Sequence, residues 1–115
     1  MMRRRRTKTK YGNHPVVVNG IRFDSEKEYR RFCELQIMQK AGVISDLQRQ
    51  VAFELQPAFY HKGKKIQAIR YIADFTYTDN ESGEYVIEDV KGVRTREYLL
   101  KKKMMQYRGN DIKET

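Results

Sequence analysis

The charged side chains near the middle of the chain have the types and the spacing needed for chemistry on a phosphate ester. Asp89 and Lys91 lie two residues apart at the end of an apolar run, so a strand would place both on one face. Asp74 interrupts a second apolar run, between Ala73 and Phe75. Two carboxylates and one amine can hold a divalent cation and assist a nucleophile, provided that the two runs lie side by side.

A turn between the two runs predicts that they pair. Residues 79–83 have the sequence Asp-Asn-Glu-Ser-Gly, which is typical of a turn. Strands paired symmetrically about Ser82 would place Asp74 almost opposite Asp89 and Val90, because the sum of paired residue numbers is nearly constant in an antiparallel hairpin. We therefore expect the two carboxylates to converge.

Neighbouring carboxylates repel each other, and a shared proton, a cationic side chain or a divalent ion relieves the repulsion. Lys91 supplies one positive charge against two negative charges. Mg²⁺ commonly binds one or two carboxylates and keeps waters and phosphate oxygens in its other positions. The predicted cofactor is Mg²⁺, with Mn²⁺ as the other candidate, and Lys91 is expected to orient the nucleophile or to stabilise charge on the phosphate.

Turn and capping residues mark two elements before these strands. Asn19-Gly20 stands between two runs of β-forming residues, which predicts a small hairpin. Ser25 and Glu28 form a capping box, which predicts a helix over about residues 26–41. Its apolar residues recur at helical spacing and predict one broad buried face: Tyr29, Phe32, Cys33, Leu35, Ile37, Met38 and Ala41.

The remaining pattern predicts a sheet. A first strand is expected around residues 53–56, a second over about 66–78 and a third over about 84–91, in an antiparallel meander. Residues 111–115 are expected to form a short strand parallel to the third. The predicted fold is therefore α/β, with a mixed, mainly antiparallel central sheet, flanking helices, and the order helix, three strands, helix, strand.

The predicted second helix spans about residues 96–108. Thr95 can cap its first turn, and Gly109-Asn110 ends it. Its expected apolar row consists of Leu100, Met104 and Tyr107. The basic run of this helix, a candidate for phosphate contact, consists of Lys101, Lys102 and Lys103.

Composition narrows the class of partner. Lys and Arg number 24 against 15 Asp and Glu, a formal charge of +9, so a polyanion is expected. Residues 1–13 hold little to bury and are predicted to be a flexible basic arm before a single domain over residues 14–115. No run approaches membrane-spanning length, so no membrane partner is expected. One cysteine, Cys33, excludes an internal disulfide and fits a reducing cytoplasm.

Two segments resemble the split signature of the PD-(D/E)xK nuclease superfamily, which includes restriction enzymes and phage-type Holliday-junction resolvases. They are Tyr71-Ile72-Ala73-Asp74-Phe75 and Glu88-Asp89-Val90-Lys91-Gly92, with Ala73 in place of the first motif residue. The stretch from Lys10 to Lys113 is more specifically similar to a phage protein family, domain of unknown function 1064. The resemblance implies a restriction-endonuclease-like fold and a metal-dependent DNA endonuclease of phage DNA processing or recombination.

The resemblance also implies that an acid of the first helix completes the metal site, and Glu28 is the position that matches. Glu28 shares a helical row with Phe32 and Leu35, so its side chain can lean toward the sheet, while the capping box explains the same residue without a metal. Glu26 is the alternative on this helix. Glu88 is the alternative on the third strand if the register differs by one.

Further candidates concern contacts to the substrate. Gln56, on the first strand, is a candidate for contact with the nucleophilic water or the substrate, and a plain role on the strand surface is the alternative. His14 and His61 stand outside any ligand-spaced motif and are not expected to bind metal. The arm adds four candidates for phosphate contact, Arg3, Arg4, Arg5 and Arg6, and a solvated basic surface is the alternative for them and for the helix lysines.

The predicted function is Mg²⁺-dependent hydrolysis of DNA phosphodiester bonds. The alternative is a non-catalytic, basic nucleic-acid-binding protein in which the acids are incidental, and RNA is a further candidate substrate. The structure of the substrate stays open at this level. Two cuts in opposed strands would require a homodimer, and no heptad or interface in the sequence decides this.

Overall fold

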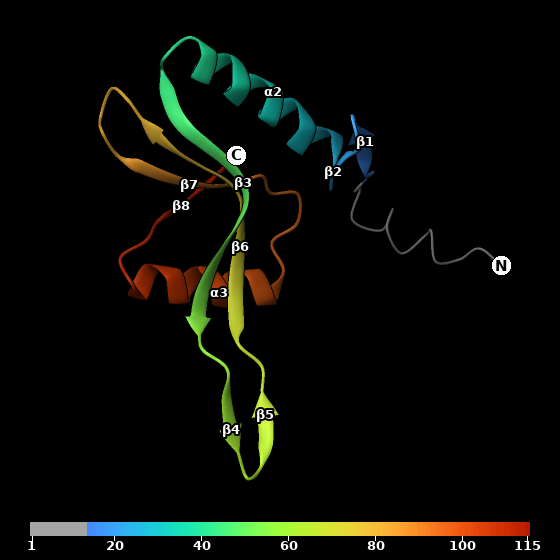
Figure 1. Ribbon diagram of the computed structural model, residues 1–115, viewed down its shortest axis with the longest axis vertical. Helices are drawn as coiled ribbons and strands as arrows, with labels where there is room; N and C mark the ends of the chain where they lie inside the picture. Colours follow the sequence, from blue (N-terminus) through green and yellow to red (C-terminus); the bar gives the residue numbers. More distant parts are fainter. Residues whose placement is uncertain (1–13) are drawn as a thin grey trace, which may run out of the picture.

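The computed structural model describes residues 14–115, so the predicted arm, residues 1–13, lies outside the described residues. A four-stranded sheet of order β3-β6-β7-β8 carries helices α2 (Glu26–Lys40) and α3 (Arg96–Tyr107) (Figure 1). The strands β3, β6 and β7 pair antiparallel, and β8 joins β7 in parallel. This is the predicted mixed α/β fold. The strand bounds are β3 Ile44–Gln56, β6 Ile69–Asp79, β7 Tyr85–Asp89 and β8 Ile112–Glu114.

Two small hairpins stand outside the central sheet. The first, β1 (Val16–Val18) with β2 (Ile21–Phe23), confirms the prediction from Asn19-Gly20, since both turn residues have positive φ, 52° and 81°. The second, β4 (Phe59–His61) with β5 (Lys64–Ile66), has the same kind of turn. The predicted second strand over 66–78 merged the end of β5 with β6.

The predicted first strand was too short. Strand β3 begins at Ile44, well before residues 53–56. Asp46 and Gln50 have positive φ, 56° and 52°, and the pairing with β6 shifts between Ser45 and Gln48. The exposure of side chains still alternates along β3, but the less exposed positions of its first half include Ser45 and Arg49, so this half carries no apolar period-two signal. The predicted third strand was too long, because β7 ends at Asp89 and Lys91 follows it.

Two apolar clusters hold the helices to the sheet. Helix α3 packs on a cluster that includes Leu55, Tyr71 and Ala73, whereas helix α2 packs through Leu35 on a cluster that includes Phe75. The clusters meet on β6, where Ala73 belongs to the first and Phe75 to the second. Asp74 therefore lies at the junction between the two cores.

Both helices begin at their predicted caps. Glu28 N donates to Ser25 Oγ at 3.1 Å, and Tyr98 N donates to Thr95 Oγ1 at 3.1 Å. The reciprocal bond of the α2 cap differs from the expected one, since Glu28 Oε1 accepts from Asp24 N, one residue before the cap. Neither helix within residues 14–115 is long and apolar enough to cross a membrane.

The buried faces of the helices agree with the predicted stripes only in part. On α2, Phe32, Leu35 and Met38 pack toward the sheet, but Ile37 is 69% exposed. On α3 the predicted row was right only for Met104, which packs against the core, because the fully buried residues are Tyr98 and Met105. Adjacent apolar residues, such as Leu99 with Leu100 and Met104 with Met105, offer several overlapping stripes, and the neighbouring sheet decides which one is buried. The predicted apolar residues that face solvent are Ile37, Ala41, Leu100 and Tyr107.

A buried ion pair fastens α2 to the sheet. Arg31 Nε donates to Glu88 Oε2 at 2.6 Å, and Arg31 Nη2 donates to Glu88 Oε1 at 3.1 Å. Tyr77 and Thr115 hydroxyls also donate to Glu88, whose side chain is fully buried. The guanidinium and hydroxyl donors outweigh the effect of burial and lower the pKa of Glu88.

The variant Arg31→Met is expected to reduce the free energy of unfolding by about 3–5 kcal/mol, because it leaves the Glu88 carboxylate buried without its cation. The matched variant Arg30→Met removes the exposed partner of Glu26 and is expected to cost less than about 1 kcal/mol. Urea denaturation at neutral pH measures both. Equal losses in the two variants would contradict the role of Glu88 in joining helix to sheet.

Candidate active site

The β6–β7 hairpin brings the two predicted carboxylates together. Phe75 pairs with Glu88 and Thr76 with Ile87, so the same register continued by one residue places Asp74 beside Asp89. Val90 N donates to Asp74 Oδ2 at 2.8 Å across the same junction. The convergence predicted from the turn is confirmed, and it occurs where β7 ends and its backbone leaves the sheet.

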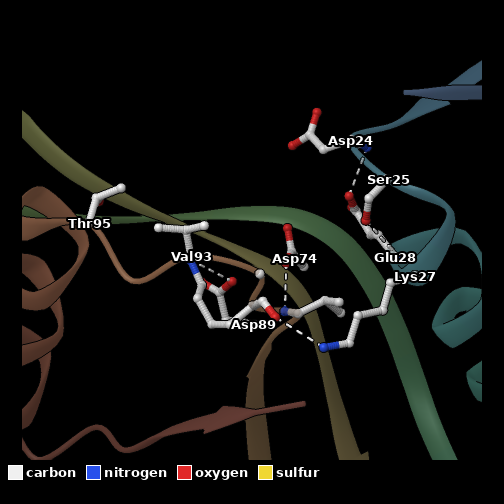
Figure 2. A pocket seen from close by; sticks show the side chains of 11 residues that line it. Asp24, Ser25, Lys27, Glu28, Asp74, Asp89, Val93 and Thr95 are labelled. Atoms are coloured by element: carbon white, nitrogen blue, oxygen red, sulfur yellow. Dashed lines mark hydrogen bonds and ion pairs between the residues drawn. The ribbon is translucent and has the colours of Figure 1, made fainter. Parts of the chain in front are cut away.

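The two carboxylates open into a hollow of about 300 Å³ (Figure 2). Three parts of the chain line it: the first turn of α2, the middle of β6, and the segment that follows β7. In Figure 2, Asp74, Asp89 and Glu28 lie around the same space. The lining residues are Asp24, Ser25, Lys27, Glu28, Asp74, Asp89, Val90, Lys91, Gly92, Val93 and Thr95.

Asp89 and Lys91 are held in place by aromatic residues. Asp89 is 5% exposed, and its Oδ2 accepts from the Tyr71 hydroxyl at 2.5 Å. Lys91 Nζ lies 3.2 Å from Asp89 Oδ1 and 3.7 Å from the centroid of the Tyr98 ring. The carboxylate and the ring face both attract the ammonium, so Lys91 is positioned beside the acidic pair.

Burial raises the pKa of Asp74 to about 8, and the negative charges of Asp89 and Glu28 add to the shift. The bond from Val90 N acts in the opposite direction and is too weak to cancel them. A carboxyl in this state keeps its proton near neutral pH unless a cation arrives. Among the described residues, the Lys91 ammonium therefore does not balance the negative charge of both carboxylates.

Glu28 is buried in the same hollow, but its oxygens are engaged. Oε1 accepts from Asp24 N, and Oε2 accepts from Gln50 Nε2 at 3.3 Å with Arg49 Nη2 at 3.9 Å. Within residues 14–115, no three His, Cys, Asp or Glu side chains are grouped closely enough to hold a metal ion. The expected set of three acidic metal ligands is therefore reduced to Asp74 and Asp89, because Glu28 is already hydrogen-bonded to Asp24 N and to Gln50.

The alternative acids lie elsewhere. Glu26 is exposed and pairs with Arg30, and Glu88 points to the opposite face of the sheet, toward Arg31. Gln56 is also outside the hollow, since it pairs with Ile69 at the far end of β6. The structure thus distinguishes Glu28 from its two alternatives by position.

Sequence reasoning missed three polar residues of the site. Asp24 and Lys27 line the hollow from the start of α2, and Lys27 Nζ donates to the Lys91 carbonyl at 3.0 Å. Gln50 stands where the β3–β6 register faces Asp74. The β3 register would have indicated Gln50, but that strand was not recognised before residue 53.

The three lysines of the basic run on α3 have different environments. Lys101 pairs with Glu97 at 3.0 Å and lines a second hollow that shares Asp74 and Asp89. Lys102 pairs with Glu114 at 3.0 Å. Lys103 is exposed and forms no ion pair with the described residues. Arg70 lines the second hollow as well, whereas Arg3 to Arg6 lie outside the described residues.

Comparison with known protein families finds a match over nearly the whole chain. The family described as Protein of unknown function (DUF1064) matches residues 8–115. No curated protein and no solved structure matches the chain. The family match covers every residue of the hollow, from Asp24 to Thr95.

The raised pKa of Asp74 predicts that the metal-free protein loses stability as pH rises. The folded state keeps a proton that the unfolded state releases above its ordinary pKa of 3.8, so the free energy of unfolding falls between about pH 4 and pH 8. Asp74→Asn is expected to flatten this dependence and to raise the free energy of unfolding at pH 8. Thermal unfolding in chelator at several pH values measures it. If Asp74→Asn keeps the slope of the unmutated protein, a group other than Asp74 causes the dependence.

Proposed function

The chain belongs to the family described as Protein of unknown function (DUF1064), and we propose that it is a metal-dependent endonuclease that hydrolyses DNA phosphodiester bonds. The observation that carries the proposal is the group of Asp74, Asp89 and Lys91 at one hollow, with too little positive charge to balance both acids. A divalent cation would compensate the two acids and could bind an oxygen of a phosphodiester at the same time.

The donor set fits Mg²⁺ or Mn²⁺. Both are hard cations that take carboxylate oxygens, and the hollow offers Asp74 and Asp89 as ligands while no thiol lines it. When bound, the ion would stabilise negative charge on the phosphate and lower the pKa of a water. Burial makes both carboxylates poorly solvated, so a cation gains more there than at an exposed pair.

The protein's own cations complete the proposed chemistry. The Lys91 ammonium is positioned to orient the nucleophile or to stabilise charge that develops on the phosphate. Lys27, held by the Lys91 carbonyl, brings a second positive charge to the edge of the same hollow. Glu28 and Gln50 are hydrogen-bonded to each other and provide polar groups that can hold a water in position.

The order of the motifs supports membership of the PD-(D/E)xK superfamily. Asp74 lies on the second strand of the sheet and Asp89 with Lys91 at the end of the third, as the split signature requires. Ala73 packs in a core cluster, which accounts for a small apolar residue in the first motif position. The net charge of +9 supports DNA as the partner, and phage DNA processing or recombination is the proposed setting.

Asp89→Asn is expected to abolish cleavage that depends on Mg²⁺ or Mn²⁺, by about 10²-fold or more, because it removes a ligand charge. DNA binding should stay equal or become tighter, since the variant also removes a negative charge from the site. Gel assays on single-stranded, duplex and branched DNA measure cleavage, and Asp111→Asn, an exposed change, is the matched control. If the unmutated protein cleaves none of these with either metal, a non-catalytic binding protein is favoured.

Lys91→Met is expected to lower kcat about 10²- to 10³-fold and to leave Mg²⁺ affinity equal or higher, because the ammonium competes with the metal for Asp89. Calorimetric titration with Mg²⁺ separates this result from a loss of the metal site. Lys40→Met, an exposed change at the end of α2, is the control. If the variant loses Mg²⁺ binding together with cleavage, Lys91 maintains the structure of the metal site and has no separate role in the reaction.

A further inference from the structure

The hairpin of β4 and β5 projects from the rest of the protein. Its pairs are Phe59 with Ile66, Tyr60 with Lys65 and His61 with Lys64, and neither strand joins the central sheet. Figure 1 shows the hairpin as an arm beyond the ends of β3 and β6. Every residue from Phe59 to Ile66 is exposed, so the arm contributes no buried side chain to either core.

The β4–β5 arm carries positive charge without compensation. Residues 57–68 contain Lys62, Lys64, Lys65 and His61 and no Asp or Glu. None of these lysines forms an ion pair within residues 14–115, where lysines such as Lys101 and Lys102 do. A basic side chain that has no acidic neighbour keeps its full attraction for an external anion.

The same arm exposes apolar and aromatic surface. Tyr60 is 72% exposed and Phe59 is 43% exposed. Because paired residues share a face, Tyr60 lies beside Lys65, whereas Phe59 and Ile66 lie on the face of Lys64. Lysine beside an exposed ring is the combination that binds a nucleic-acid backbone and stacks on its bases.

We propose that the β4–β5 arm is a second DNA contact of this protein, separate from the cleavage site. Its lysines bind phosphates, and Tyr60 stacks on a base where the strand is unpaired. A two-stranded ribbon also fits the major groove of a duplex. Nine residues of chain separate Lys65 from Asp74, so the two lie at most roughly 30 Å apart at about 3.3 Å per residue, or about nine base pairs. The distance between the DNA bound by the β4–β5 arm and the cleaved bond has meaning only if the proposed function holds, whereas DNA binding by this arm does not depend on it.

A second copy of this chain is a poorer occupant. Each face of the arm carries at least one lysine, and no acid within residues 57–68 could pair with it across a symmetric contact. Two arms stacked on each other would bring like charges together, which is unfavourable. A polyanion is therefore favoured over self-association.

The test compares two double variants that remove the same charge. Lys64→Gln with Lys65→Gln is expected to weaken binding to a 30-base-pair duplex up to about 60-fold at 0.1 M salt, and to reduce the slope of log K against log salt by about 2. The control, Lys40→Gln with Lys113→Gln, removes exposed lysines from α2 and β8 and should change binding less than about threefold. Fluorescence anisotropy in chelator measures both, with thermal unfolding as a check of folding.

Equal slopes for the two double variants would overturn the proposal. Because binding is measured without metal, its result is independent of cleavage. A reduced slope in a protein without nuclease activity would support DNA binding by the β4–β5 arm and contradict the proposed endonuclease. Nuclease activity with an unchanged slope would contradict only DNA binding by the β4–β5 arm. A reduced slope on an RNA duplex but not on DNA would also overturn the assignment of DNA.

Tyr60→Ala tests the stacking contact. It is expected to weaken binding to a 30-nucleotide single strand at least about fivefold, with a smaller effect on the duplex. Tyr85→Ala, a change at a tyrosine that is 55% exposed on β7, is the control and should leave both unchanged. Unchanged single-strand binding in Tyr60→Ala would remove stacking from the proposal. A lower mass in sedimentation for the arm variants would assign the arm to self-association instead.

Discussion

Two carboxylates buried beside each other impose the constraint to which the rest of the site responds. Asp89 is 5% exposed, and burial with the charge of its neighbour raises the pKa of Asp74 to about 8. Within residues 14–115, the groups that face the pair directly are one ammonium, Lys91, and two dipolar donors, Val90 N and the Tyr71 hydroxyl. This is less than two negative charges need out of water, so the pair takes either a proton or a cation.

Glu88, on the same strand, is a buried carboxylate whose negative charge is fully compensated. It is next to Asp89 in sequence and more deeply buried, yet its pKa is lowered, because Arg31 and the hydroxyls of Tyr77 and Thr115 donate to it. Alternation sends Glu88 to the α2 face and Asp89 into the hollow. One acid therefore joins helix to sheet, and the other belongs to the pair at which we propose that an external cation binds.

The scaffold keeps this uncompensated pair in place by building a core on each side of it. Asp74 lies between Ala73, packed under α3, and Phe75, packed under α2. Helix α3 also supplies Tyr98, whose ring holds the Lys91 ammonium, while α2 supplies Glu28 and Lys27. Close packing on both sides limits how far the two acids can move apart.

The sequence by itself determined the features that follow local rules: the caps at Ser25 and Thr95, the Asn19-Gly20 hairpin, and the convergence of Asp74 with Asp89 across one turn. Tertiary structure alone decided what depends on neighbours remote in the chain. The less exposed face of β3 includes Ser45 and Arg49, so the apolar pattern did not reveal the first half of this strand or Gln50, which donates a hydrogen bond to Glu28. Packing against the sheet buries Met105 and leaves Leu100 exposed, which helical spacing alone did not predict. A turn couples residues close in sequence, whereas a buried face is selected by whatever surface packs against it.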